Sequence, residues 1–367
     1  MKLLAVHPGA SYATGDVFVG YHRALLGQGH DLVVYALDAR IDLANEFYHW
    51  AYRKQGLGPH PPSALVLQHA CGHIVPQALY HQVDGVIVWS AMRLHPDTLV
   101  LLKRAGIPTA VILSESPYDD REQARVLARR ERGEPVVDIA FTNERASLPY
   151  LRQYHPNVQY LAHAYDPHTS RPTVMPGMAP RHDVLFIGTM FEERAALLGS
   201  VDWEAEGIDL GIYGMAKNLG SRHRLRKFVR GGIVDNHIAQ SYYRTAKIVL
   251  NPYRTSRGFG KGVEHIEHAE SLNPRALELA ACGAFSLSEH RAEVAEVFGP
   301  LVPTYTGPAD FLTNVRYFLD HEGERDALRK QLPGAVKGHT YAARAAELMA
   351  HIEAAWSSRG RVGAVSA

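Results

Sequence analysis

The feature that most constrains the fold of this 367-residue chain is an alternation of short aliphatic runs with longer helical patterns. Such alternation is typical of βαβ units, in which helices connect parallel strands, and not of a β-sandwich. The expected strands of the first half are 3–6, 32–37, 86–89, 109–113 and 139–142. The alternation then restarts at 184–187, 210–213, 248–250, 285–287 and 301–303. The sequence therefore predicts an α/β protein with two doubly wound, Rossmann-like domains, which also fits a length of about 150 residues per domain.

A proline-rich segment separates the two halves. Residues 165–181 contain four prolines, a density that neither a regular helix nor a central strand tolerates. We therefore expect a first domain over 1–165, a linker over 166–182 and a second domain over 183–340. Helical spacing of apolar residues predicts a closing helix over 341–356, able to cross back to the first domain, and a flexible tail over 357–367. Two such domains are expected to leave a cleft, with ligands bound beyond the carboxyl ends of the strands.

Composition excludes several classes of protein. Cys71 and Cys282 lie far apart without a CxxC motif, and the 21 histidines show no HExxH spacing, so we expect neither disulfides nor a metal or other cofactor. No run of 18 apolar residues occurs, and the apolar start is too short for a signal peptide, so we expect a cytoplasmic protein without a membrane span.

The most informative segment is 271–285. Asn273 is a preferred N-cap, Pro274 suits the first helical position, and Gly283 suits a left-handed C-terminal stop, so a short helix followed by a strand is predicted. Arg275 and Glu278 share one face of that helix, beside an N-terminus that favours anions. An Arg can hold a phosphate by two hydrogen bonds, and a carboxylate can accept from both ribose hydroxyls. On spacing alone, an ordinary surface Arg–Glu pair is the simpler explanation.

This segment resembles the donor-site helix of GT-B glycosyltransferases, specifically the CgeB-like, spore-maturation-protein type of the glycosyl transferase group 1 family. The resemblance extends to 184–189 followed by Glu193 and Arg194, to 246–252 and to 283–288. It covers most of residues 183–300, whereas the first domain resembles the family only in its opening strand, loop and helix.

The resemblance implies that the second domain binds a nucleotide-sugar donor. Arg275 and Glu278 then correspond to diphosphate and ribose contacts at the helix that Asn273 caps. The same correspondence places Gly188, Thr189 and Arg194 in a loop that faces the diphosphate.

Two glycine turns have a rationale of their own. A glycine after a strand lets backbone N–H groups approach phosphate oxygens, although Gly188–Thr189 also fits an ordinary tight turn. Tyr213 and Gly214 follow the next strand and are candidates to flank the nucleobase. Packing is the commoner role of a tyrosine at a strand end.

Positive charge is concentrated between Lys217 and Lys261, where 11 basic residues occur with a single acid, Asp235. These residues are candidates for a basic wall facing an anionic acceptor, nucleic acid included. A solvated basic surface is the simpler alternative. Residues 258–262 look like a phosphate loop but lack the Ser or Thr of a Walker A motif, so we expect only a loop near the cleft.

The first domain offers candidates for the acceptor side. Its loop after the first strand lacks GxGxxG spacing, which argues against a dehydrogenase, and we expect Ser11 and Tyr12 to line the acceptor cleft. Asp16 is a candidate general base, with a helix N-cap as the simpler role. Glu115 is a second candidate base, and His163 a further cleft residue, although an isolated histidine usually satisfies local hydrogen bonds.

The sequence thus favours a glycosyltransferase that moves a sugar from a nucleotide diphosphate, with UDP the expected nucleotide, to a hydroxyl group. Arg275, Arg194 and the helix N-terminus would stabilise the departing diphosphate without a metal. The acceptor stays open between a small molecule, a glycan, a protein and DNA carrying a hydroxylated base. A nucleotide-sugar epimerase and a non-catalytic nucleotide- or nucleic-acid-binding protein are the alternatives, and oligomeric state is not predicted.

Overall fold

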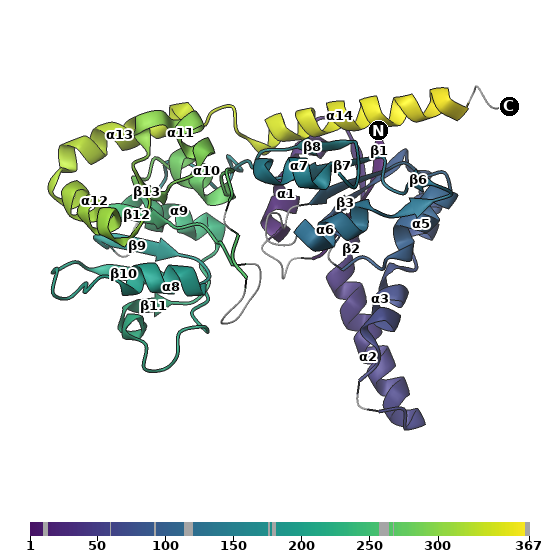
Figure 1. Ribbon diagram of the computed structural model, residues 1–367, viewed down its shortest axis with the longest axis horizontal. Helices are drawn as coiled ribbons and strands as arrows, with labels where there is room; N and C mark the ends of the chain where they lie inside the picture. The colour runs from purple at the N-terminus through teal and green to yellow at the C-terminus, as the bar shows by residue number, and fades with distance from the viewer. Residues whose placement is uncertain are drawn as a thin grey trace. The chain divides into compact units, whose positions relative to one another are not determined.

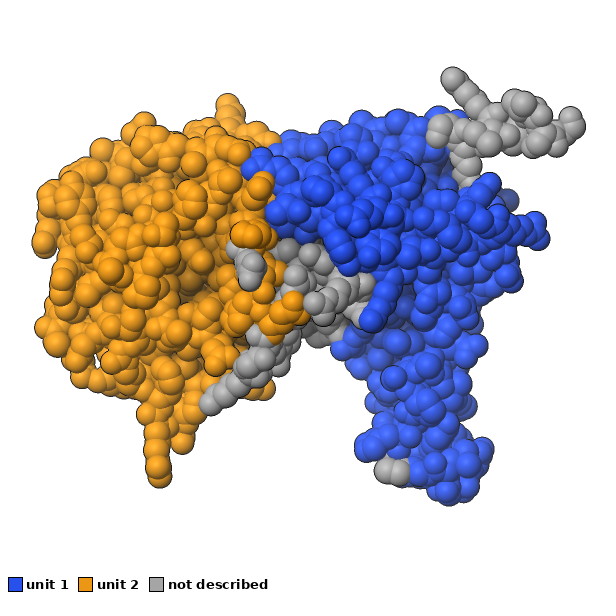
Figure 2. Space-filling model, viewed as in Figure 1, with its two compact units in different colours: residues 1–162, 341–367 blue, residues 163–340 orange. Residues whose placement is uncertain are grey.

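The computed structural model describes residues 1–9, 14–58, 60–91, 93–113, 120–174, 177, 181–256, 264–266 and 268–363, without the side chains of 14–16, 120–123 and 358–363. The chain forms two compact units (Figure 2): unit 1 comprises residues 1–162 and 341–367, and unit 2 comprises residues 163–340. In the sequence, the boundary between the start of unit 1 and unit 2 therefore lies at 162/163, whereas we expected it at 165.

Unit 1 contains a six-stranded parallel sheet in the order β2-β1-β3-β4-β7-β8 (Figure 1). Its strands are β1 (Lys2–His7), β2 (Asp31–Ala36), β3 (Gly85–Trp89), β4 (Thr109–Leu113), β7 (Ile139–Thr142) and β8 (Val158–Tyr160). Every residue of β3, β4 and β7 is buried, as expected of a parallel sheet with helices on both faces. The five expected strands are confirmed to within a residue or two at their ends, and β8 was not predicted.

The helices of unit 1 are α1 (Thr14–Gly27), α2 (Leu37–Gln55), α3 (Ser63–Cys71), α4 (Ile74–Tyr80), α5 (Asp97–Arg104), α6 (Asp120–Leu127), α7 (Leu148–Leu151) and α14 (Tyr341–Gly363). A 3₁₀ turn (Arg145–Ser147) precedes α7, and a two-stranded antiparallel ribbon joins β5 (Arg130–Glu131) to β6 (Glu134–Pro135).

The closing helix α14 packs on unit 1 through two glycines. A Cβ atom on Gly20 would lie 2.2 Å from the Tyr341 ring, and one on Gly85 would lie 2.3 Å from the Trp356 ring. Only residues without a side chain let these two rings approach so closely. The helix runs on to Gly363, seven residues beyond the end that we expected, so the predicted tail from 357 is largely helical.

Unit 2 contains a second six-stranded parallel sheet, in the order β11-β10-β9-β12-β13-β14. Its strands are β9 (Val184–Ile187), β10 (Leu210–Tyr213), β11 (Val229–Gly231), β12 (Ile248–Asn251), β13 (Ser286–Glu289) and β14 (Thr304–Tyr305). The strand expected at 301–303 is wrong, because a 3₁₀ turn over Gly299–Leu301, with its central proline, occupies the start of that stretch. The short β11 was not predicted.

The helices of unit 2 are α8 (Glu192–Gly199), α9 (Asn236–Thr245), α10 (Pro274–Ala281), α11 (Ala292–Phe298), α12 (Pro308–Asp320) and α13 (Glu322–Ala335), with a 3₁₀ turn at Arg224–Phe228. Alternate strand residues face opposite sides of the sheet. Phe186 packs with α8 and α12, whereas Ile187 packs with α9 and α10. The start of the expected linker is docked within unit 2, where Tyr165 pairs with Thr340.

The strand order of unit 2 identifies where a ligand should bind. The chain moves outward from β9 to β10 and β11, and then returns to β12 on the other side of β9. Ligands of open parallel sheets bind beyond the carboxyl ends of the strands at such a reversal. The loops that follow β9 and β12 are therefore the place to examine.

Candidate functional site

The turns that follow β9 and β10 are stacked directly on each other. The Gly188 N–H donates to the Tyr213 carbonyl at 2.9 Å, and the Met190 N–H donates to the Met215 carbonyl at 2.8 Å. Gly214 has a φ of +114°, and a Cβ atom there would lie 2.3 Å from the Gly188 carbonyl oxygen. Residue 214 must therefore be glycine on both conformational and steric grounds.

Helix α10 begins and ends as the sequence predicts. The Asn273 side chain caps it by accepting from the Ala276 N–H at 2.9 Å, Pro274 is the first helical residue, and Gly283 has a φ of +64°. The helix N-terminus is thereby fixed near β9, because Arg275 in its first turn donates from Nη1 to the Ile187 carbonyl.

Arg275 also lies against the Gly188 turn. Its Nη1 is 2.8 Å from the position that a Cβ atom on Gly188 would occupy, so the missing side chain makes room for the guanidinium. The Arg275 Nε is buried and has no hydrogen-bond partner among the described residues. This arrangement places an incompletely satisfied cation beside a glycine turn and a helix N-terminus.

Tyr243 on α9 ties Arg275 to Glu278. Burial raises the pKa of the Tyr243 hydroxyl to about 12; the Arg275 guanidinium opposes that shift, and the Glu278 carboxylate adds to it. Both charged side chains thus act on the same buried phenol. The structure brings together the two residues to which the sequence assigned the diphosphate and the ribose.

Arg194 has a different environment from the one that we expected. Its side chain is only 9% exposed, its Nη1 donates to the Thr189 carbonyl at 2.9 Å, and its Nε donates to the Pro252 carbonyl at 3.1 Å. The guanidinium therefore joins the loop after β9 to the loop after β12, from inside the protein. Both guanidiniums lie at the glycine turn, since a Cβ atom on Gly188 would be 2.8 Å from the Arg275 Nη1 and 3.7 Å from the Arg194 Nη1, but only Arg194 joins the two loops.

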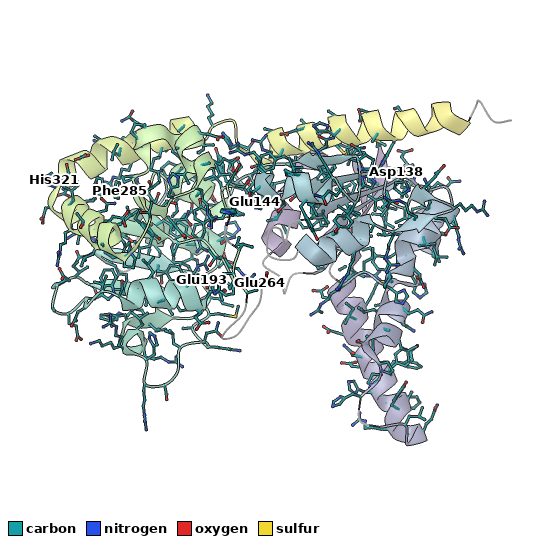
Figure 3. The ribbon with its side chains drawn as sticks, in the orientation of Figure 1. Asp138, Glu144, Glu193, Glu264, Phe285 and His321 are labelled. Carbon is teal, nitrogen blue, oxygen red and sulfur yellow. The ribbon has the colours of Figure 1, made fainter. Side chains whose placement is uncertain are left out.

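Glu193, the neighbouring residue of α8 (Figure 3), holds the loop after β12. Its Oε1 accepts from the Thr255 N–H at 2.9 Å and from the Ser256 N–H at 3.3 Å. The first turn of α8 thus holds residues 252–256, which lead into 257–263. That segment contains the glycine-rich 258–262 and lies outside the described residues.

A buried polar network links the N-cap of α10 to the ends of β12 and β13. Asn251 is 2% exposed, accepts from the Asn273 amide at 3.0 Å and lies 3.4 Å from the Ser288 hydroxyl. The Glu289 carboxylate accepts from the Tyr253 N–H at 2.8 Å. We did not predict roles for these residues; the signal was present, since polar residues end two neighbouring strands.

Tyr213 packs inside unit 2, which is the commoner role of a tyrosine at the end of a strand. Its side chain is buried, and its hydroxyl lies 3.1 Å from the His182 Nε2. The Nδ1 of His182 is 2.6 Å from an Asp209 carboxylate oxygen, and the Tyr213 ring packs on Tyr242. Tyr213 therefore supports the Gly214 turn from beneath.

Most of the candidate residues for the acceptor side lie outside the described part of the chain. Ser11, Tyr12 and Glu115 lie outside the described residues, and Asp16 lies in α1 with its side chain outside them. His163 is half-buried in the segment that begins unit 2. The catalytic base is therefore still a prediction.

Most of the basic stretch is engaged within unit 2. Ion pairs join Lys227 to Glu204, Arg230 to Asp209 and Lys247 to Asp183. Three further arginines, Arg224, Arg244 and Arg254, donate to backbone carbonyls. Among the described residues, exposed basic side chains without a partner remain at Lys217, Arg222 and Arg226. Of the nine basic residues of this stretch that the structure describes, six are therefore engaged within unit 2.

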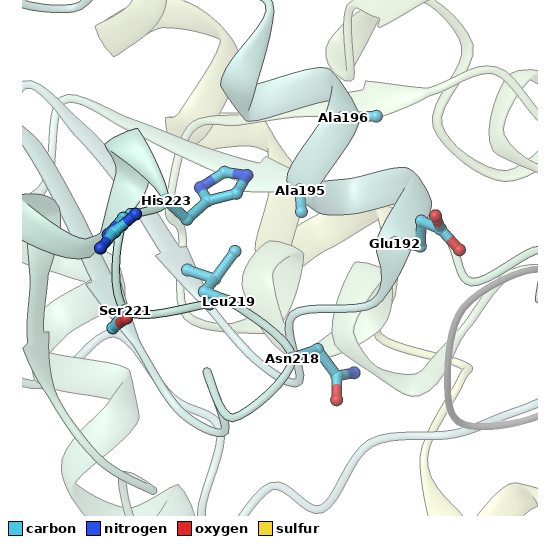
Figure 4. Close-up of a pocket in the computed structure, with 9 residues that line it drawn as sticks. Glu192, Ala195, Ala196, Asn218, Leu219, Ser221 and His223 are labelled. Atoms are coloured by element: carbon cyan, nitrogen blue, oxygen red, sulfur yellow. The ribbon is translucent and has the colours of Figure 1, made fainter.

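An open groove of about 720 Å³ lies between α8 and the loop after β10 (Figure 4). Its lining residues are Glu192, Ala195, Ala196 and 218–223. The groove lies beside α8, whereas α10, with Arg275 and Glu278, packs on the opposite face of the sheet. We therefore treat it as separate from the cluster around Gly188.

In the described part of the chain, no group of three or more His, Cys, Asp or Glu residues is arranged to hold a metal ion. Over the same residues, no helix combines the length and the apolar character that crossing a bilayer requires.

Comparison with known sequences gives two matches. A family described as glycosyl transferase-like matches residues 186–350. The spore protein CgeB of Bacillus subtilis (strain 168) is 26% identical over 257 residues, which are 66% of this chain and 74% of that protein.

Solved structures show the fold. Sucrose-phosphate synthase from Thermosynechococcus elongatus matches with a TM-score of 0.67 at 10% identity, covering 98% of this chain and all of that one. An E. coli trehalose-6-phosphate protein bound with UDP-2-fluoro glucose matches with a TM-score of 0.57 at 10% identity, covering 96% and 99% of the two chains. These likenesses confirm the predicted fold class, two doubly wound Rossmann-like domains of GT-B architecture.

Proposed function

We propose that the chain is a GT-B glycosyltransferase of the glycosyl transferase group 1 family, and that its unit 2 binds a nucleotide diphosphate sugar whose sugar the enzyme transfers to a hydroxyl acceptor. The observation that carries the proposal is the position of Arg275, which lies against the Gly188 turn at the strand reversal.

The diphosphate has a natural place at this turn. The N-terminus of α10 has a positive dipole, and the Arg275 guanidinium adds a full charge with hydrogen-bonding capacity to spare. Gly188 leaves backbone exposed where a side chain would keep phosphate oxygens away. A bound diphosphate would thus satisfy groups that the protein alone does not.

The ribose would lie at Glu278, whose carboxylate can accept from both of its hydroxyls. Tyr243 supports this assignment, because its hydroxyl is close to both charged side chains and stays neutral at ordinary pH. We expect the nucleotide to be UDP, the nucleotide carried by the ligand of the E. coli structure that shares the fold.

The reaction would break the bond between the sugar C1 and the diphosphate oxygen, and the bonding electrons would pass to that oxygen. The acceptor oxygen would form the new bond to C1 and lose its proton to a base, for which Asp16 and Glu115 are the candidates. Arg275 and the α10 N-terminus would stabilise the growing charge on the leaving group, so we propose transfer without a metal ion.

The direct test is a panel of UDP-, GDP- and ADP-sugars, with nucleotide release and sugar transfer followed with and without EDTA. Binding of UDP is measured in parallel by calorimetry. We expect UDP binding, and release that EDTA does not slow. Arg275→Gln should reduce both strongly, whereas Arg222→Gln, at an exposed position away from the turn, should reduce neither.

Other outcomes separate the alternatives. An altered sugar without an acceptor product indicates an epimerase, and UDP binding without any turnover indicates a non-catalytic binding protein. If no nucleoside diphosphate binds to the wild-type protein, the proposed donor site is wrong.

A further inference from the structure

Helix α2 of unit 1 has an apolar stripe, a row of side chains that its neighbours cover only in part: His69 of α3 stacks on Phe47, and the Lys54 ammonium lies 4.8 Å from the centroid of the Trp50 ring. Leu43, Phe47 and Trp50 are 64%, 51% and 52% exposed, and their spacing places them along one side of the helix. Single exposed apolar side chains are ordinary, but a contiguous row of large ones marks an interaction surface.

The stripe is not the face by which α2 is attached to the protein. Leu37, Ile41 and Ala44 are the buried residues of the helix, and Tyr48 contacts His69 of α3. Figure 1 shows α2 and α3 extending away from the sheet of unit 1. The stripe is therefore a second face, open to a partner.

The sequence of α2 is arranged symmetrically about Trp50. Glu46 and Lys54 lie four residues before and after it. In an antiparallel pair of identical helices that cross at Trp50, Glu46 meets Lys54 of the second copy. Such a surface is self-complementary, as a two-fold interface requires.

Charge along the helix favours the same arrangement. The first half of α2 contains Asp38, Asp42 and Glu46 with one basic residue, Arg40, and the second half contains Arg53 and Lys54. A parallel pair would bring like charges together, whereas an antiparallel pair brings the acidic half of each helix to the basic half of the other. We propose that α2 is a self-association surface through which two copies of this chain pair as antiparallel helices.

The available area predicts the strength of the pairing. The three apolar side chains together expose roughly 350 Å² per copy, whereas a standard stable interface buries about 800 Å² per partner. Flanking charged side chains add to the contact. We therefore expect a concentration-dependent dimer in the micromolar range and not an obligate one. The proposal is independent of the donor site in unit 2.

A charge-reversal cycle on the full-length protein tests the pairing, with the mass measured by sedimentation velocity over a range of concentrations. Glu46→Lys or Lys54→Glu alone places like charges together at both symmetric contacts and should weaken dimerisation about tenfold. The double variant Glu46→Lys/Lys54→Glu should restore it. An equimolar mixture of the two single variants should form heterodimers, because each supplies the charge that the other lacks.

Controls separate loss of pairing from loss of folding. Both positions are exposed, so circular dichroism and thermal unfolding should match those of the wild type. Trp50→Glu should abolish the dimer, whereas Tyr80→Glu, at another exposed aromatic residue of unit 1, should leave it intact. A wild type that stays monomeric at 100 µM, or a dimer that the single reversals do not weaken, would overturn the proposal. So would a monomer whose Trp50 fluorescence shifts to the blue on phosphatidylcholine vesicles, because a lipid surface would then be what covers the stripe.

Discussion

Gly214 lies so close to Gly188 that a Cβ atom on Gly214 would be 2.3 Å from the Gly188 carbonyl oxygen. The turns after β9 and β10 are stacked at this point, and Arg275 contacts Gly188 on its other side. The backbone that we assign to the diphosphate is therefore held between one glycine and one arginine.

Gly214→Ala should disrupt this stacking. The substitution places a Cβ atom into the Gly188 backbone at a φ of +114°, and we expect it to cost about 2–3 kcal/mol of stability and to weaken UDP binding at least tenfold. Urea unfolding and calorimetry measure the two effects. Gly232→Ala is the matched control, because a Cβ atom there meets nothing within 4 Å. Equal effects at both positions would contradict the assignment.

Gly188 and Arg275 should be energetically coupled. A methyl group at 188 would lie 2.8 Å from the Arg275 Nη1, so Gly188→Ala should displace the guanidinium and weaken donor binding. In an Arg275→Ala background the same substitution should have little further effect, since the group that it displaces is gone. A double-mutant cycle on UDP affinity measures this coupling. Strict additivity would show that the two residues act separately.

Substitutions of Arg194 and Arg275 should affect stability and turnover differently. Arg194→Met leaves two carbonyls, those of Thr189 and Pro252, without their buried donor, and should cost about 3 kcal/mol of stability. Arg275→Met removes one such bond, to the Ile187 carbonyl, so it should cost only about 1 kcal/mol of stability while depressing turnover strongly. Denaturant unfolding and kcat, measured on both variants, distinguish a positioning role from a binding role. The reverse pattern would exchange the two assignments.

The free energy of unfolding should decrease as the pH is lowered, because of the buried His155 in unit 1. Its Nε2 donates to the Val137 carbonyl at 2.9 Å and its Nδ1 accepts from the Asn157 N–H at 3.1 Å, so the ring is held neutral. Burial lowers its pKa below the ordinary value of 6.5.

The unfolded chain therefore binds the proton more readily than the folded protein does. Stability is full above pH 6.5 and is lost as the pH falls through 6.5 toward the folded pKa, by up to about 1.4 kcal/mol per pH unit. His155→Leu should be less stable at pH 7.5 but should show a shallower loss between pH 7 and 5. Denaturant unfolding at several pH values measures both slopes, and identical slopes would exclude His155 as the source.

Prediction from sequence worked where the signal is local. The cap at Asn273, the stop at Gly283 and the strands β9 and β10 depend on residues next to each other in the chain, and all are confirmed. The three-residue strands β8 and β11 were missed because so few residues carry no periodic pattern.

The site was harder to predict, because its roles depend on which distant groups a side chain reaches. Arg275 and Arg194 are both arginines near glycine turns in sequence terms, yet one donates to a carbonyl of β9 and the other joins two loops inside the protein. Tyr213 follows a strand like a ligand contact but bends back to His182. Asn251 became informative only once its partner Asn273, 22 residues away, was known.

The packing of α14 on Gly20 and Gly85 bears on how the protein forms during translation. Unit 1 takes residues from both ends of the chain, whereas unit 2 is continuous from 163 to 340. On the ribosome, unit 2 has its whole sequence available before the aromatic rings of α14 have emerged to cover the two glycines. The order of synthesis therefore lets the second unit mature while the first still waits for its closing helix.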